Sequence, residues 1–144
     1  MTRYEFIIPG EPMGKERPRF SHVGKYVHTY TPPKTVRYEK KVRESLFKED
    51  ESVTVLKGAI RAEIHAVFPI PTSTKKKLRA EMEQGNVPYT KKYDIDNVIK
   101  IVLDALNEVV YEDDKQVTEV YATKVYGKDP CVKVIIEELT DEVV

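Results

Sequence analysis

The clearest alternation of hydrophobic and polar positions runs through residues 59–68 and predicts a strand with one buried face. Residues 131–138 alternate in the same way and predict another strand. Turn residues at Val23-Gly24-Lys25 divide a β-forming stretch over residues 19–31, which predicts a hairpin. Two further strands are predicted from β-forming residues, at 3–9 and 117–126, and residues 127–130 predict a turn after the second of them.

Hydrophobic residues three and four positions apart predict a helix over residues 94–109. Asp94 can cap its first turn. Its apolar stripe consists of Val98, Val102, Ala105, Leu106 and Val109. Two more helices are expected, at 33–48 and at 73–84, the latter capped by Ser73 or Thr72. Together these elements predict an α+β fold, a small mixed β-sheet with two to three helices packed on it, in a single domain of residues 1–144.

Charge divides the chain into two halves. The 144 residues include 24 Lys+Arg and 24 Asp+Glu, so the formal net charge is zero, which excludes a uniformly basic nucleic-acid-binding chain. Residues 1–48 nevertheless carry 11 Lys+Arg against 5 Asp+Glu, and residues 49–92 carry 8 against 6. Residues 93–144 carry 5 against 13. A basic half is therefore joined to an acidic half, and each half needs its own explanation.

Simple features exclude several classes of function. The single cysteine, Cys131, cannot form an intramolecular disulfide and favours a reducing, cytoplasmic location. No signal peptide and no apolar run of membrane-spanning length is visible, so no membrane partner is expected. Glycine-rich phosphate loops are absent, so no nucleotide cofactor is expected, and the three histidines lack the spacing of metal ligands.

Carboxylates concentrate where the predicted helix 94–109 begins and just after it ends. On a helix, Asp96, Lys100 and Asp104 share one face, and Asp94 stands at its N-terminal end. A loop carrying Asp113 and Asp114 can fold back toward these residues, and convergent carboxylate oxygens suit a hard ion such as Mg²⁺. Beside a phosphate-binding surface, such an ion would assist phosphodiester hydrolysis, and Lys100 could stabilise the developing charge. The alternative is purely structural: an N-cap, a solvated ladder of ion pairs and an acidic turn.

Cations and aromatic residues alternate in the basic half. Lys15, Arg17 and Arg19 would point the same way in an extended segment. Aromatic residues at positions 26, 28 and 30 alternate nearby. A second basic patch consists of Lys75, Lys76, Lys77 and Arg79. Both patches are candidates for contacts with a DNA backbone, and the alternative is a solvated basic surface.

The motifs of the acidic half resemble those of the RusA family of Holliday-junction resolvases. The similarity covers roughly residues 5–136. It is carried by the combination Asp94-Ile95-Asp96-Asn97, Lys100, Asp104-Ala105-Leu106-Asn107 and Asp113-Asp114-Lys115-Gln116-Val117, together with Gly10, Pro12, Lys15, Arg17-Pro18-Arg19 and Tyr30-Thr31-Pro32.

This resemblance implies a small α+β homodimer that cleaves four-way DNA junctions by paired symmetric nicks, with Mg²⁺ or Mn²⁺, in DNA recombination and repair. It implies that Asp94, Asp96 and Asp114 bind the metal and that Lys100 is essential. Supporting roles fall to Asn97, Asp104, Asp113 and Gln116. Members of the family are often encoded in prophages, which leaves the host role open.

Two rival functions are compatible with the same residues. One is a metal-dependent nuclease for other branched DNA, such as flaps or forks. The other is a junction-binding protein without catalysis, although the presence of Asp94, Asp96, Lys100 and Asp114 argues against it. A Ca²⁺-binding regulatory role has no support, because no EF-hand loop is present.

Overall fold

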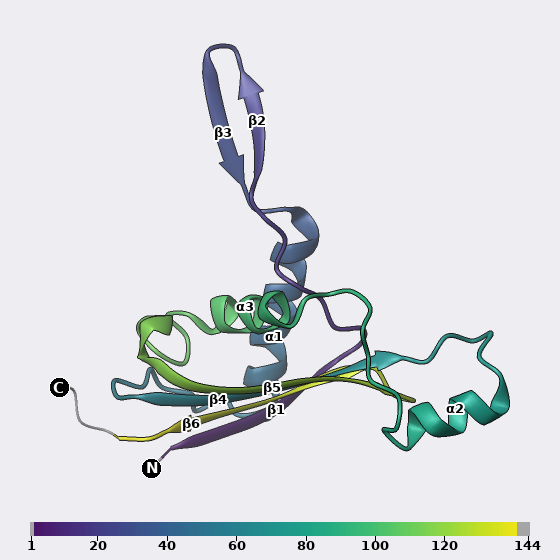
Figure 1. The fold of residues 1–144 in the computed structure, drawn as a ribbon. Helices are drawn as coiled ribbons and strands as arrows, with labels where there is room; N and C mark the ends of the chain where they lie inside the picture. The colour runs from purple at the N-terminus through teal and green to yellow at the C-terminus, as the bar shows by residue number, and fades with distance from the viewer. Residues whose placement is uncertain (1, 141–144) are drawn as a thin grey trace.

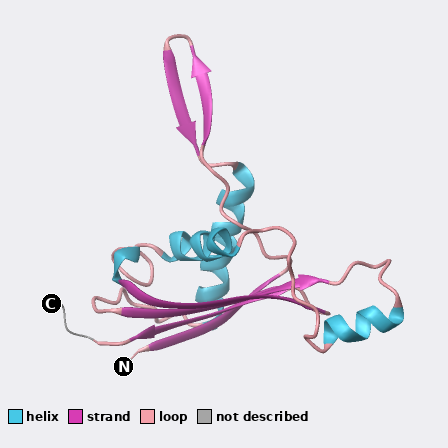
Figure 2. Ribbon diagram, viewed as in Figure 1, coloured by secondary structure: helices cyan, strands magenta, loops and turns pink. Residues whose placement is uncertain are grey.

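The computed structural model describes residues 2–140, in which a four-stranded mixed sheet forms the base of the molecule (Figure 1). Its strands lie in the order β1 (Arg3–Pro9), β6 (Cys131–Glu138), β4 (Ile60–Pro69) and β5 (Val117–Gly127). The strand β6 is antiparallel to both of its neighbours, whereas β4 and β5 are parallel. The predicted α+β class is confirmed, because the chain combines a mixed β-sheet with α-helices (Figure 2).

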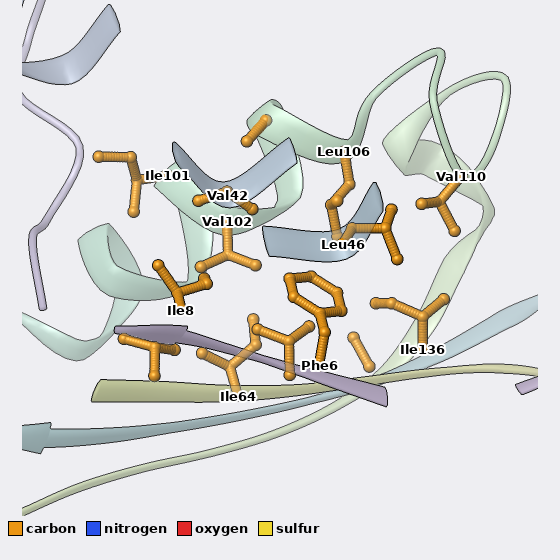
Figure 3. Close-up of a cluster of buried hydrophobic side chains, with 14 of the residues drawn as sticks. Phe6, Ile8, Val42, Leu46, Ile64, Ile101, Val102, Leu106, Val110 and Ile136 are labelled. Carbon is orange, nitrogen blue, oxygen red and sulfur yellow. The ribbon is translucent and has the colours of Figure 1, made fainter. Parts of the chain in front are cut away.

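Two helices, α1 (Pro33–Glu49) and α3 (Ile95–Leu106), pack on one face of this sheet (Figure 1). The alternation in residues 59–68 has the predicted consequence, since alternate residues of β4 from Ile60 to Phe68 are buried. Figure 3 shows how side chains from the sheet and both helices meet, including Phe6 of β1, Leu46 of α1 and Leu106 of α3. Burying each such side chain contributes roughly 1.5–3 kcal/mol, so this core fixes α3 on the sheet.

The helix α3 ends three residues earlier than the predicted boundary at residue 109. Its C-terminal cap is Asn107, and Glu108 has a φ of +66°, which turns the chain away from the helix axis. Tyr111 is then buried in the core, and its hydroxyl donates a hydrogen bond to the carbonyl of Leu103 at 2.5 Å. Burial of Tyr111 is a long-range effect, so the helical periodicity of the sequence does not reveal this end.

The second helix, α2 (Lys76–Glu83), starts later than predicted, and neither Thr72 nor Ser73 caps it. Its N-cap is Lys75, without a side-chain hydrogen bond. The preceding residues instead form a turn, in which the Arg79 guanidinium donates hydrogen bonds to the carbonyls of Pro71 and Thr72 at 2.8 and 3.3 Å. This helix lies at the end of the sheet rather than on its face (Figure 1).

The short connection after β5 leads directly into β6, yet the two strands are not hydrogen-bonded neighbours. Strand β4 lies between them. Which strands become neighbours in a sheet depends on tertiary packing and not on the length of the connecting turn. The sequence therefore predicted the strands but not their order in the sheet. Among residues 2–140, the structure contains no helix that is both long and apolar enough to cross a membrane.

The hairpin predicted over residues 19–31 is present as a separate two-stranded sheet, β2 (Arg19–Val23) and β3 (Tyr26–Tyr30). It projects away from the helices and the main sheet (Figure 1). The loop residue Gly24 has a φ of +62°, a conformation that glycine adopts without strain and that tight hairpin turns require.

Candidate active site

Asp94 and Asp96 lie at the N-terminal end of α3, where the sequence places them. Asp94 is the N-cap residue, and its backbone carbonyl accepts hydrogen bonds from the amides of Asn97 and Val98, both at 3.1 Å. Its carboxylate makes no capping hydrogen bond, so the prediction of a side-chain cap is wrong. Both carboxylates are exposed. Their oxygens therefore remain available to a ligand at the helix end.

Lys100 and Asp104 form the second half of the polar face of α3. The Lys100 ammonium lies 3.1 Å from Asp104 Oδ1. The other carboxylate oxygen of Asp104 lies 3.3 Å from the ammonium of Lys15. Asp104 is therefore paired with two cations, Lys100 and Lys15. The ion pairs of this face thus connect α3 to the N-terminal segment, and Lys100 pairs with Asp104 rather than with Asp96.

Lys15 is a structural cation in this arrangement. Besides Asp104, its ammonium contacts Glu39 Oε2 of α1 at 3.1 Å, and its backbone amide donates to the carbonyl of Asn97 at 2.8 Å. Its side chain is 20% exposed. Lys15 thus joins residues 10–18 to both helices. The prediction that Lys15 lies with Arg17 and Arg19 along one side of an extended strand is therefore wrong for Lys15.

A short 3₁₀ helix, η1 (Asp114–Gln116), presents Asp113 and Asp114 after the turn that follows α3. The Gln116 side chain holds this segment in place through four hydrogen bonds, two accepted by its amide oxygen and two donated by its amide nitrogen. Its amide oxygen accepts from the backbone amides of Glu112 and Asp113 at 2.8 and 3.1 Å. Its amide nitrogen donates to the carbonyls of Leu56 and Gly58 at 2.9 and 3.0 Å. The segment is therefore fixed to residues that precede β4.

The two neighbouring aspartates of this segment have opposite electrostatic environments. The backbone amide of Lys115 donates to Asp113 at 2.9 Å and holds the pKa of that carboxyl below its usual value. Burial and the adjacent Asp113 raise the pKa of Asp114, with Asp104 acting in the same direction and Lys100 against it. Asp114 is therefore a carboxylate crowded by negative charge.

The structure places Asp114 within electrostatic reach of Lys100 and Asp104. Asp96 is separated from Asp104 by about 12 Å along the helix axis, from the rise of a helical residue. Within residues 2–140, no group of three or more His, Cys, Asp or Glu side chains is close enough to hold a metal ion. The donor set is nonetheless of the type that a hard divalent cation prefers. Asp94 and Asp96 are exposed and have no ion-pair partner in the described part of the chain, and the carboxylate of Asp114 is crowded by negative neighbours.

Two residues that sequence reasoning missed position the start of α3. The Lys124 ammonium of β5 donates to the carbonyls of Tyr93 and Lys91 at 2.7 and 3.2 Å. Gly14 packs so closely that a Cβ atom there would lie 2.7 Å from Tyr93 Cβ. A strand lysine carries no sequence signal for such a role, whereas the glycine lies in residues 10–19, a segment whose two prolines and two glycines are typical of a loop.

The remaining basic candidates lie on the surface. Arg17 and Arg19 are exposed at the root of the hairpin, and Arg19 contacts Glu16 at 3.5 Å. Lys75, Lys76 and Lys77 are exposed at the start of α2, on the part of the molecule that lies beyond the end of the sheet (Figure 1). The two patches are therefore separate surfaces.

Comparison with known proteins agrees with the resemblance seen in the motifs. The family model described as endodeoxyribonuclease RusA matches residues 9–137. The chain is also 33% identical over 142 residues to a protein of Bacillus subtilis (strain 168) named "Uncharacterized protein YqaN", covering 97% of this chain and 99% of that protein. The chain therefore belongs to the RusA family of endodeoxyribonucleases, hydrolases that cut DNA.

Proposed function

We propose that this protein is a Holliday-junction resolvase, which nicks opposite strands of a four-way DNA junction in recombination and repair. The observation that carries the proposal is the pair Asp94 and Asp96 at the start of α3, with neither carboxylate used for capping or in an ion pair with another residue of the described chain. A family match over residues 9–137 supports a DNA phosphodiester as the substrate.

The residues suited to hold Mg²⁺ or Mn²⁺ are Asp94, Asp96 and Asp114, because hard ions prefer carboxylate oxygens. When bound, such an ion supplies a Lewis acid for the scissile phosphate and lowers the pKa of the attacking water. The three carboxylates would hold such an ion beside the polar face of α3. Negative charge crowded around Asp114 favours a cation there.

Lys100 is the proposed electrostatic catalyst. Its ammonium can stabilise the charge that develops on the phosphate in the transition state. Asp104 positions that ammonium through the 3.1 Å ion pair. Asp113 and Gln116 act further away, by ordering the segment that carries Asp114, and Asn97 joins α3 to the N-terminal segment through its backbone carbonyl.

We also expect the protein to act as a homodimer. A four-way junction has approximate two-fold symmetry, so two opposed nicks need two active sites related by a dyad. The exposed cations Arg17, Arg19 and Lys75–Lys77 are the proposed contacts with the DNA backbone, which provide affinity without reading sequence. We also expect a cytoplasmic location, because the single cysteine, Cys131, favours a reducing compartment.

The test is a comparison of substrates. Labelled four-way junctions, flaps and plain duplex are incubated with the protein in Mg²⁺, in Mn²⁺ and in EDTA. We expect paired symmetric nicks in the junction, little cutting of the other substrates, and none in EDTA. Preferential cutting of flaps would assign the protein to other branched DNA, and tight junction binding without cleavage would make it a binding protein.

A further inference from the structure

The hairpin formed by β2 and β3 has no hydrophobic core. Every one of its strand residues is exposed except Ser21, which is partly exposed. It stands clear of the helices and the sheet (Figure 1). An isolated two-stranded hairpin is only marginally stable in water, and its apolar side chains are exposed rather than packed against other parts of residues 2–140. A surface of this kind is expected to be covered when the protein works.

Three large rings are distributed over both faces of the hairpin. Residues directly opposite each other in an antiparallel pair share a face. Tyr26 lies opposite Val23 at the tip, and Tyr30 lies opposite Arg19 at the root of the same face. Phe20 is on the other face, opposite Thr29. The exposed fractions of Phe20 and Tyr26 are 69% and 74%, so a flat group can stack on each face of the hairpin.

Positive charge surrounds the root and the tip of the hairpin. Lys25 occupies the turn, and Arg17 and Arg19 lie at the root, where the only acid of residues 15–30 is Glu16. A cavity of about 210 Å³ lies on the adjacent helix α1. Its lining residues are Met13, Lys34, Arg37, Tyr38 and Lys41.

The cavity on α1 suits a backbone phosphate. Three of its five lining side chains are cations, and none is an acid. No ion pair of Lys34, Arg37 or Lys41 is found with any residue of the described range 2–140, whereas Lys40 of the same helix pairs with Glu44. Unpaired cations around a small concavity indicate a site for an anion with the size of a phosphate.

We propose that the β2–β3 hairpin is a branch-recognition arm, on which Phe20, Tyr26 and Tyr30 stack against unpaired bases while the α1 cavity holds a neighbouring phosphate. The proposal rests on the assignment of branched DNA as the substrate. In an intact duplex both faces of each base are stacked on neighbours, whereas bases at a branch point can be displaced. Aromatic rings interleaved with cations are the combination that binds unstacked bases.

The other potential occupant of the hairpin is the hairpin of a second copy. Charge argues against it, because two copies would bring together surfaces that each carry an excess of positive charge. Insertion of the ribbon into the major groove of a duplex arm is the alternative mode of DNA contact. That mode would use polar side chains of the hairpin, such as His22 and His28, to reach base edges. It would leave the exposed phenyl ring of Phe20 unexplained, because this ring has no hydrogen-bonding group.

The experiment measures binding and does not depend on cleavage. Affinities of the full-length protein for a four-way junction and for a duplex of equal length are measured in EDTA over a series of salt concentrations. The variants are Phe20→Ala and Tyr26→Ala, with ring-retaining partners Phe20→Tyr and Tyr26→Phe. Val27→Ala is the matched control, since Val27 is on the same face as Phe20, is 55% exposed and carries no ring.

We expect each ring removal to weaken junction binding by about 5- to 150-fold, the range for loss of one base–aromatic stack. Duplex binding, the salt dependence and the melting temperature should stay as in the wild type, because no charge and no core contact is lost. The ring-retaining variants and Val27→Ala should bind normally. Lys25→Ala should instead reduce the salt slope by about 0.9 for each phosphate contact removed.

Three results would overturn the proposal. Unchanged junction affinity in both ring-removal variants would exclude stacking. An equal loss on junction and duplex would indicate groove binding. A loss accompanied by dissociation of an oligomer in sedimentation would make the hairpin a contact between protomers. The proposed nuclease activity is judged separately, because wild-type cleavage in Mg²⁺ succeeds or fails whatever these binding results are.

Discussion

Removing the positive charge of Lys15 should destabilise the fold without changing the number of phosphate contacts. The Lys15 ammonium lies between Glu39 and Asp104, at 3.1 and 3.3 Å, and the side chains of the two acids are 13% and 23% exposed. In Lys15→Met the two carboxylates would face each other across an apolar side chain. Arg17→Met, two residues further along, removes the same charge from an exposed position and is the matched control.

The size of the effect follows from the burial of these pairs. Exposed ion pairs contribute about 0.2–1 kcal/mol, whereas breaking a fully buried pair costs about 3–5 kcal/mol. The partly buried pairs of Lys15 lie between these limits, so we expect a loss of about 1–3 kcal/mol in the free energy of unfolding. For a chain of this length, each kcal/mol lowers the melting temperature by roughly 2–4 °C, which gives a total decrease of roughly 2–12 °C.

Two measurements distinguish the structural role of Lys15 from the DNA-binding role of Arg17. Thermal unfolding should show the decrease for Lys15→Met and no change for Arg17→Met. Junction binding in EDTA should lose about 0.9 of salt slope in Arg17→Met and none in Lys15→Met. If Lys15→Met melts like the wild type and loses the same salt slope as Arg17→Met, then Lys15 contacts DNA and its structural role is wrong.

Three further predictions concern the core and the supports of the site. Leu106→Ala should cost about 2–5 kcal/mol in a denaturant titration, because Leu106 is fully buried between α3 and the sheet; an unchanged midpoint would contradict this packing. Gln116→Ala removes four hydrogen bonds to backbone groups and should cost about 2–4 kcal/mol and slow cleavage. Gln116→Glu keeps the acceptor alone and should be intermediate, so equal effects of the two changes would exclude a role for the donor bonds. Gly14→Ala should force Tyr93 away and reduce the cleavage rate, with a loss of about 1–3 kcal/mol in stability, and wild-type values for both would refute this contact.

Local patterns predicted the elements of the fold because their causes are local. The alternation in residues 59–68 corresponds to the buried and half-buried positions of β4, and Gly24 marks the hairpin turn through its positive φ. Element ends were less accurate where contacts with residues outside the helix decide them. The end of α3 depends on burial of Tyr111, and the start of α2 on hydrogen bonds of Arg79 to the preceding turn.

The site was predictable to a similar degree. Spacing placed Lys100 and Asp104 on one face of α3, and the ion pair confirms it. It could not show that Asp104 also pairs with Lys15, because the partner lies far away along the chain. For the same reason Lys15 was grouped with Arg17 and Arg19 as a DNA contact, and Lys124, which supports Tyr93 from β5, was missed. The sequence therefore identifies residue types for a site more reliably than the contacts that position them.

The most direct test of the proposed active site is the cleavage of a labelled four-way junction by Asp94→Asn and Asp96→Asn in Mg²⁺. Asp129→Asn, an exposed aspartate outside the site, is the control for the same change of charge. We predict that both site variants lose cleavage while junction binding is kept or slightly strengthened, because a negative charge near phosphate is removed. The control should cut normally. Cleavage at the wild-type rate by Asp94→Asn and Asp96→Asn would contradict the assignment of the catalytic carboxylates.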